Sequence, residues 1–327
     1  GTEILHRRSP THPELDRTWW KSFKKRYSDR LSCKFLDSRE FARANVRADD
    51  VFRYFGEVVQ ALQAIAHPKQ VVNMDESGFS SRIDKGRRKK CVFCPDLRVE
   101  PRFQEERNST QLSYVAAVNL AGEPLMPMFI TKERVLFNQK DLQMIQSYVK
   151  CVQSPRGYMN EETMGHWIDE IWKPYCDSVR AALGKPDAPM FLIMDNCPSH
   201  CTQNIMQKFT TCGNTRLIWL PPHSSHFLQP LDASYFAVLK AYYRSFKTLV
   251  TTPRVSGKVL RAFRAAWTAS FPPNIFRCWE LVGFMYENIG TNNMRAVLNM
   301  DVVLSLIREN CQDHETVDDD AWDSGTE

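Results

Sequence analysis

The chain has 327 residues and a net charge of +5, and 43% of its residues are hydrophobic. This length suits one large domain or two ordinary ones, and the composition is typical of a folded protein. No apolar run approaches the roughly 20 residues that span a bilayer, and the N-terminus has no secretion signal, so neither membrane insertion nor secretion is expected. Ten cysteines are scattered along the chain, which favours a reducing compartment over a disulfide scaffold.

The charge is distributed unevenly along the chain. Residues 312–327 include seven acidic residues and no Lys or Arg, so the rest of the chain carries a net charge of +12. A basic excess of this size favours a polyanionic partner such as nucleic acid.

The N-terminal part has helical periodicity. Trp19, Trp20 and Phe23 share one side of a helix predicted over 17–27. Its charge comes from basic residues, namely Lys21, Lys24, Lys25 and Arg26. Two interpretations remain open from these residues alone: a solvated surface helix, or a DNA-contacting helix at the end of a helix-turn-helix unit. A further helical segment is predicted over 38–66.

The pattern then changes to that of an α/β domain. A helix is predicted over 161–183, with a kink at Pro174. A second helix opens at Asp232, and the chain from its end to about residue 306 is predicted to be helical. Short apolar runs predict strands over 70–75, 111–118, 125–130, 190–194 and 216–220, with a hairpin turn at 119–122. This order of strands and helices is typical of α/β folds.

Three acids stand at ends of these predicted elements. Asp75 follows the first strand, Asp195 follows the fourth, and Asp232 opens a helix. Because ligands gather at the carboxyl ends of strands in open α/β sheets, we expect these acids to converge. Each acid also has a structural explanation: Asp75 as a turn residue with Glu76 as the ligand, Asp195 as an Asx-turn, and Asp232 as a helix N-cap.

Three sequence motifs contain these acids. They read Asn-Met-Asp-Glu-Ser-Gly-Phe over 73–79, Met-Asp-Asn-Cys-Pro-Ser-His over 194–200, and Leu-Pro-Pro-His-Ser-Ser-His-Phe-Leu-Gln-Pro-Leu-Asp over 220–232. They resemble the acidic motifs of the DDE superfamily of transposases, in the branch that contains pogo, Tigger, Jerky and centromere-protein-B-like proteins. The resemblance is firm from about Val71 to Arg244, and 36 residues separate Asp195 from Asp232.

The resemblance implies a fold and a function. The fold would be a ribonuclease-H-like α/β catalytic core with helical N-terminal and C-terminal extensions. The activity would be metal-dependent DNA cleavage and strand transfer at transposon ends. Asp75, Asp195 and Asp232 would be the catalytic residues and would hold two Mg²⁺ or Mn²⁺ ions, which can activate a nucleophile and stabilise a leaving alkoxide. The partner would be double-stranded DNA carrying terminal inverted repeats, a homodimer is compatible with this activity, and the location would be the nucleus.

The resemblance also divides the chain and extends the candidate site. The division is the end of a helix-turn-helix region with a helical linker (1–66), the catalytic core (67–250), a helical extension (251–311) and an acidic tail (312–327). The basic residues expected to contact DNA are Lys21, Lys24, Lys25, Arg87 and Arg88. The basic stretch that contains Arg87 and Arg88 is equally well explained as a solvated loop.

Other features have weaker interpretations. Cys91-x-x-Cys94 would need further ligands such as Cys197, His200 or Cys201 to hold zinc, and an edge strand explains it better. His200, His223 and His226 are candidate phosphate contacts, although an isolated histidine is more often structural. The sequence also departs from the family, which usually has a glycine soon after the third acid, whereas Ala233, Ser234 and Tyr235 stand here.

Two other functions fit the same motifs. A host genome can retain such a protein as a sequence-specific DNA-binding regulator that no longer cuts DNA. A nuclease of the same fold that cuts RNA or structured DNA is a third interpretation. The intact acids favour the transposase.

Overall fold

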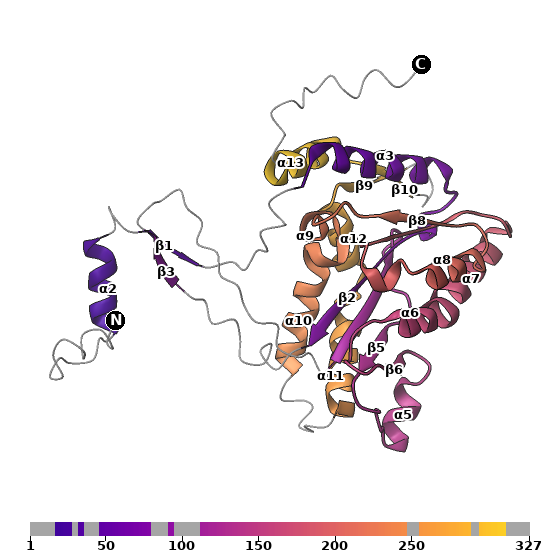
Figure 1. Cartoon of the computed structure of the whole chain (residues 1–327), viewed down its shortest axis with the longest axis horizontal. Helices are drawn as coiled ribbons and strands as arrows, with labels where there is room; N and C mark the ends of the chain where they lie inside the picture. Colours follow the sequence, from indigo (N-terminus) through magenta and orange to yellow (C-terminus); the bar gives the residue numbers. More distant parts are fainter. Residues whose placement is uncertain are drawn as a thin grey trace, which may run out of the picture. The chain divides into compact units, whose positions relative to one another are not determined.

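The structure is a computed structural model that describes residues 17–27, 32–35, 46–79, 91–94, 112–246, 255–288 and 294–311 (Figure 1). The chain divides into two compact units, each described here by itself. One comprises residues 1–40 and 86–107, and the other comprises 41–85 and 108–327.

The described residues of the smaller unit form one helix and two short strands. Helix α2 spans Arg17–Arg26, as the aromatic periodicity predicts, and Trp19 stacks on Phe23 with ring centroids 4.9 Å apart. Strands β1 (Ser32–Phe35) and β3 (Cys91–Cys94) pair antiparallel. The Cys-x-x-Cys segment is therefore a strand, as expected.

The larger unit is built on a six-stranded mixed sheet in the order β6-β5-β4-β2-β7-β8. Strand β4 runs antiparallel to both of its neighbours, and all the other neighbouring pairs are parallel. The strands are β2 (Val71–Phe79), β4 (Leu112–Asn119), β5 (Met128–Thr131), β6 (Lys150–Gln153), β7 (Met190–Met194) and β8 (Thr215–Trp219). This is the ribonuclease-H-like α/β core predicted from the sequence, and its expected strands all occur, with β7 at its predicted bounds and the others with shifted ends.

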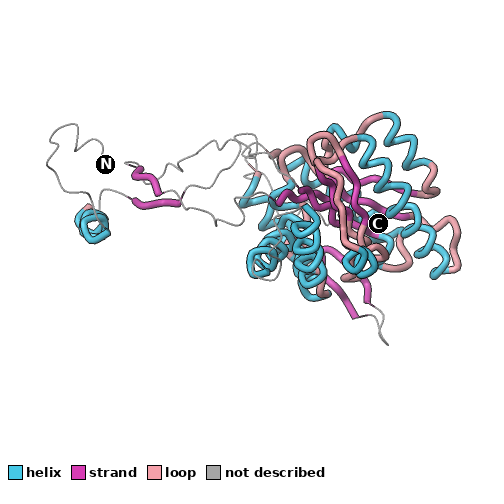
Figure 2. Tube along the Cα trace, turned by 90° about the horizontal axis from the view of Figure 1, so that it is seen from below, coloured by secondary structure: helices cyan, strands magenta, loops and turns pink. Residues whose placement is uncertain are grey.

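Helices cover both faces of this sheet (Figure 2). On one face, the stacked rings of Trp167 and Trp172 pack with Met74 and Leu192 of the sheet. The helices there are α6 (Glu161–Trp167), η3 (Ile168–Trp172), α7 (Lys173–Leu183) and α8 (Gln203–Thr210). The helices of the other face are η5 (Leu231–Tyr235), α10 (Phe236–Ser245), α11 (Val255–Ala269) and α12 (Pro272–Glu280).

Shorter elements connect these layers. They are η2 (Pro68–Gln70), α5 (Gln139–Ile145), η4 (Pro198–His200) and α9 (Ser225–Leu228). Helix α3 (Ala48–Ala64) buries Val51, Phe55 and Val58 in the same core cluster as α10 and α11. It lies within the helical segment predicted over 38–66.

The predicted kink at Pro174 takes a specific form. A wide turn, η3, immediately precedes α7, and Pro174 occupies the first turn of α7. The first turn tolerates proline because its N–H groups have no partner within the helix, and the wide turn upstream accommodates the ring. The helical path therefore continues through Pro174 instead of ending there.

The C-terminal extension is not entirely helical, which corrects the expectation for 251–311. After α11 and α12, strands β9 (Phe284–Asn288) and β10 (Met294–Leu298) pair antiparallel, and α13 (Met300–Asn310) follows. Phe284 of β9 is buried against Trp279, with ring centroids 4.8 Å apart. The aromatic spacing of this segment alone indicates a helix. The segment forms strands instead because its side chains are buried in this core.

Candidate functional site

The three acids come from three separate elements of the larger unit. Asp195 directly follows β7, and Asp232 lies in the first turn of η5, as predicted. Asp75 does not stand at a strand end, because β2 continues to Phe79. The reason is that β2 has two partners: its parallel pairing with β7 ends at Asn73, whereas its antiparallel pairing with β4 continues to Phe79. Asp75 thus lies just beyond the end of the parallel pairing.

Asp75 is the most buried of these acids, with 8% of its surface exposed. Burial raises the pKa of its carboxyl well above the ordinary value, and the charges of Asp232, Glu76 and Asp195 raise it further. The side chain of Gln229 offsets part of this rise as a hydrogen-bonding neighbour. Asp232, Glu76 and Asp195 therefore lie near enough to Asp75 for their charges to act on it.

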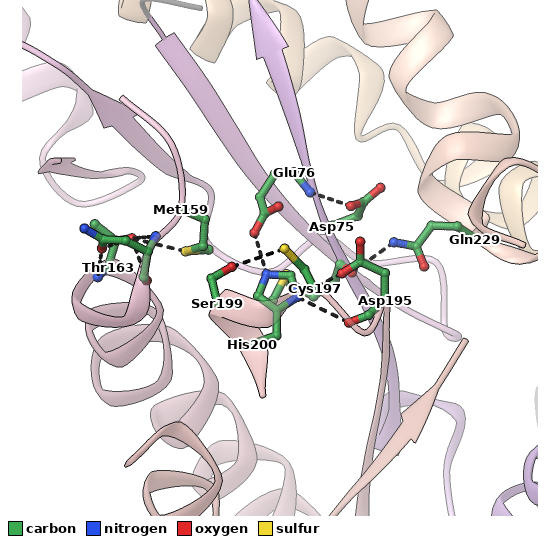
Figure 3. A network of polar contacts seen from close by, with 11 residues as sticks. Asp75, Glu76, Met159, Thr163, Asp195, Cys197, Ser199, His200 and Gln229 are labelled. Carbon is green, nitrogen blue, oxygen red and sulfur yellow. Dashed lines mark hydrogen bonds and ion pairs between the residues drawn. The ribbon is translucent and has the colours of Figure 1, made fainter. Parts of the chain in front are cut away.

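His200 joins two of these acids (Figure 3). Its side chain is 1% exposed, and its Nε2 lies 2.9 Å from Oε1 of Glu76. Its Nδ1 lies 2.9 Å from Oδ1 of Asp195. Burial by itself would lower the pKa of His200, but the hydrogen bonds and charges of Asp195 and Glu76 raise it to about 11. His200 therefore carries a positive charge at neutral pH and reduces the repulsion among the acids.

Two buried amides lie behind the acids. Asn73 and Gln229 are both fully buried, and Nδ2 of Asn73 donates to Oε1 of Gln229 at 3.1 Å. The same Nδ2 donates to the carbonyl of Ile193 at 2.9 Å, and Oδ1 of Asn73 accepts from the backbone N–H of Leu231 at 3.2 Å. Sequence reasoning assigned neither amide a role, although each stands inside an acidic motif within three residues of its acid.

The remaining sequence candidates are placed less centrally. His223 adopts a left-handed backbone conformation (φ 66°), and its carbonyl lies 3.1 Å from Nδ1 of the half-buried His226. Cys201 donates to Oδ1 of Asn196 at 2.7 Å, and Cys197 lies 3.4 Å from the Ser199 hydroxyl. In the described segments these thiols have polar protein neighbours and do not form a zinc cluster.

The expected DNA contacts are only partly described. Lys21 and Lys25 are exposed on α2. The side chain of Lys24, together with Arg87 and Arg88, lies outside the described residues. The assignment of these five residues to DNA binding therefore stays a prediction. In the described part of the chain, no helix is both long and apolar enough to cross a membrane.

The donors around Asp75 suit a hard divalent cation. They are carboxylate oxygens, which Mg²⁺ and Mn²⁺ prefer. The acidic neighbours of Asp75 disfavour the ionised form of its carboxyl, and a bound cation would relieve this repulsion. Within the described residues, no three His, Cys, Asp or Glu side chains are gathered as the ligands of one ion. Since Mg²⁺ usually keeps several waters and uses one or two carboxylates, it does not require three protein ligands gathered around one ion.

Comparison with known proteins identifies the family. A sequence model of the family described as DDE superfamily endonuclease matches residues 110–279. That range contains Asp195 and Asp232, and Asp75 precedes it. The chain is 26% identical over 209 residues to a protein of Cochliobolus lunatus named MFS-type transporter clz9, covering 62% of this chain and 22% of that protein. It is 21% identical over 306 residues to CENP-B homolog protein 2 of Schizosaccharomyces pombe, covering 87% and 55%. The chain thus spans only part of either relative.

Among solved structures, those of the Mos1 transposase are similar to this chain. The Mos1 mariner paired-end complex with Mn has 12% identity and a TM-score of 0.46, and the match covers 86% of this chain and 74% of that one. The catalytic domain of the Mos1 mariner transposase has 12% identity and a TM-score of 0.37, with 74% and 94% covered.

Proposed function

Because the chain belongs to the DDE superfamily endonucleases, we propose that it is a transposase that cleaves DNA at transposon ends and transfers the released strands. The observation that supports this most is the effect of Asp195 and Asp232 on the pKa of the buried Asp75. Asp195 and Asp232 come from distant parts of the chain, and their charges add to the burial that disfavours the ionised form of Asp75. Such a cost is typical of functional sites and has no value for folding.

In this proposal Asp75, Asp195 and Asp232 hold two Mg²⁺ or Mn²⁺ ions. When bound, the ions would supply charge stabilisation and an activated oxygen nucleophile for phosphodiester cleavage. They would also make an acidic pocket attractive to a phosphate, which carboxylates alone would repel. The chain's own contribution is to orient the carboxylates, and His200 does this for Asp195 and Glu76 through its two ring nitrogens.

The proposed partner is double-stranded DNA with terminal inverted repeats, and the proposed location is the nucleus. The lysines of α2 would add affinity for any DNA sequence, with each phosphate contact contributing about −0.9 to the slope of log K against log salt. Replacing Lys21, Lys24 and Lys25 by Ala should flatten this slope in a filter-binding titration. An unchanged slope would return α2 to the solvated surface helix that its sequence also allows.

A cleavage assay tests the function itself. Labelled duplexes should carry the genomic DNA that flanks the coding sequence on either side, and a scrambled duplex serves as the matched control. With Mg²⁺ or Mn²⁺ we expect strand breaks at the ends of inverted repeats, followed by joining to a target plasmid. Tight, sequence-specific binding with no cleavage at any metal concentration would contradict the proposal and favour the DNA-binding regulator. Preferential cutting of RNA or of structured DNA would favour a nuclease of the same fold.

A further inference from the structure

The amide pair Asn73–Gln229 connects all three acidic motifs. Asn73 stands two residues before Asp75 on β2. Through its Nδ2 it bonds to the carbonyl of Ile193, two residues before Asp195, and through its Oδ1 to the N–H of Leu231, one residue before Asp232. One buried side chain is thus bonded to the segments that carry the other two acids.

The position of Asn73 in the sheet explains why this connection is needed. The parallel pairing of β2 with β7 ends at Asn73 and Ile193. Beyond that point the backbone ladder no longer holds the two strands together, and the acids follow within two residues. The Asn73 amide takes up the Ile193 carbonyl at this end of the ladder. This bond therefore holds the two strands together directly before Asp75 and Asp195.

Gln229 completes the connection from the side of the third acid. Its Oε1 accepts from Asn73, and its Nε2 lies 3.4 Å from the carbonyl of Met74, to which it donates. The backbone carbonyl of Gln229 also accepts from the N–H of Ala233 at 3.0 Å, within the turn that carries Asp232. Both hydrogens of the Asn73 amide and both side-chain oxygens are used, so the buried pair is geometrically specific.

We propose that Asn73 and Gln229 form an amide clamp that positions the three acid-bearing segments relative to one another and so determines the affinity of the site for divalent metal. This inference rests on the proposed function. Neither amide belongs to the ligand set, so both are positioning residues. Groups that orient metal ligands typically change metal affinity by about 10- to 100-fold when they are removed.

The chain offers a matched control at the other end of β2. Gln70 is as fully buried as Asn73, and its Nε2 donates to the carbonyl of Pro189, just before β7, at 2.7 Å. Its Oε1 accepts from the N–H groups of Ala66 and His67. Gln70 therefore also bonds β2 to the β7 segment through a buried amide, but at the end remote from the acids.

The experiment compares the parent chain with Asn73→Ala, Gln229→Met and Gln70→Ala. Hydrogen exchange of the Leu231 amide, measured relative to the amides of β4, shows whether the bond from Leu231 to Asn73 is intact. This measurement needs no metal. Calorimetric titration with Mn²⁺ alone reports the affinity of the site. For Asn73→Ala we expect Leu231 to exchange about tenfold faster, because its acceptor is lost, and Mn²⁺ to bind about 10- to 100-fold more weakly. Gln70→Ala should change neither quantity.

Each outcome has a defined meaning. Unchanged Leu231 exchange in Asn73→Ala, or unchanged Mn²⁺ affinity in a folded variant, overturns the positioning role. Equal effects of Asn73→Ala and Gln70→Ala also overturn it, since the loss would then be general. If Asn73→Ala does not fold, Gln229→Met decides, because it keeps the bonds of Asn73 to Ile193 and Leu231 and should show a smaller change in the same direction. A parent chain that binds no Mn²⁺ refutes the proposed metal site, while the exchange data still judge the clamp.

Discussion

Two buried polar side chains along strand β2 have opposite surroundings: Gln70, directly before the strand, and Asp75, within it. Near the N-terminal end, Gln70 is fully buried and its side chain bonds to Pro189, Ala66 and His67 through neutral groups. In the middle of the strand, burial raises the pKa of Asp75, and its acidic neighbours raise it further. The polar groups of Gln70 are satisfied by hydrogen bonds, whereas Asp75 is held close to like charges. The proposed function accounts for the difference, because a stability cost at the acids is acceptable where they serve chemistry.

The largest expected effect is on cleavage. Asp195→Asn removes a charge that the metal site needs, and we expect the rate of metal-dependent cleavage to fall by roughly 10³-fold or more, as when one member of a catalytic unit is lost. Asp187→Asn is the matched control, because Asp187 is exposed and precedes β7 at its opposite end. Single-turnover cleavage rates compare the two. Similar rates for both variants would remove Asp195 from the site.

The next effect is stabilisation by metal. Mn²⁺ that binds only the folded chain should raise the free energy of unfolding by about 2.7 kcal/mol at a hundredfold excess over its dissociation constant. Thermal melts with Mn²⁺ and with a chelator measure this difference. Asp195→Asn should gain much less, because one ligand is missing. An equal gain in both proteins would show that the metal binds elsewhere.

A change remote from the acids should reduce stability without affecting the metal site. Gly122, in the β4–β5 turn, has φ +82°, and a Cβ there would lie 2.6 Å from the ring of Phe276. Gly122→Ala should therefore cost about 1–3 kcal/mol of stability from backbone strain and displacement of the ring. Denaturant unfolding measures the loss, and the Mn²⁺ affinity of the folded variant should stay at the parent value. Weaker Mn²⁺ binding would show that this turn affects the metal site and would contradict the expectation that the two are independent.

The smallest effect has the opposite sign. The folded pKa of Asp75 is raised, so the unfolded chain releases this proton first, and the parent loses stability as pH rises above about 3.9 toward the folded pKa. Asp75→Asn removes this loss. Without metal it should be more stable than the parent at pH 7, by about 1.4 kcal/mol for each unit of pKa rise, and the gain should vanish near pH 3. Urea unfolding at both pH values tests this, and a variant that is less stable at pH 7 would assign Asp75 a structural role.

Much of the fold follows from local sequence. The apolar run at 190–194 forms β7 at its predicted bounds, and the run at 216–220 forms β8 shifted by one residue. Asn160 begins α6 because its side chain accepts from the N–H of Thr163, a signal within four residues of sequence. Periodicity and capping act over a few residues, so they can be recognised without knowing the partners of a segment. The acids were recognised in the same way, from contiguous motifs.

The tertiary structure alone decided which residues support those acids. The bonds of Asn73 to Ile193 and Leu231 span 120 and 158 positions of sequence, and the contact of His200 with Glu76 spans 124. Local sequence periodicity does not reveal such pairs, because they form only when separate strands and helices pack into one core. The same reason explains the extension of β2 to Phe79, which depends on pairing with β4. Sequence determined which acids the chain carries, and packing determined what holds them.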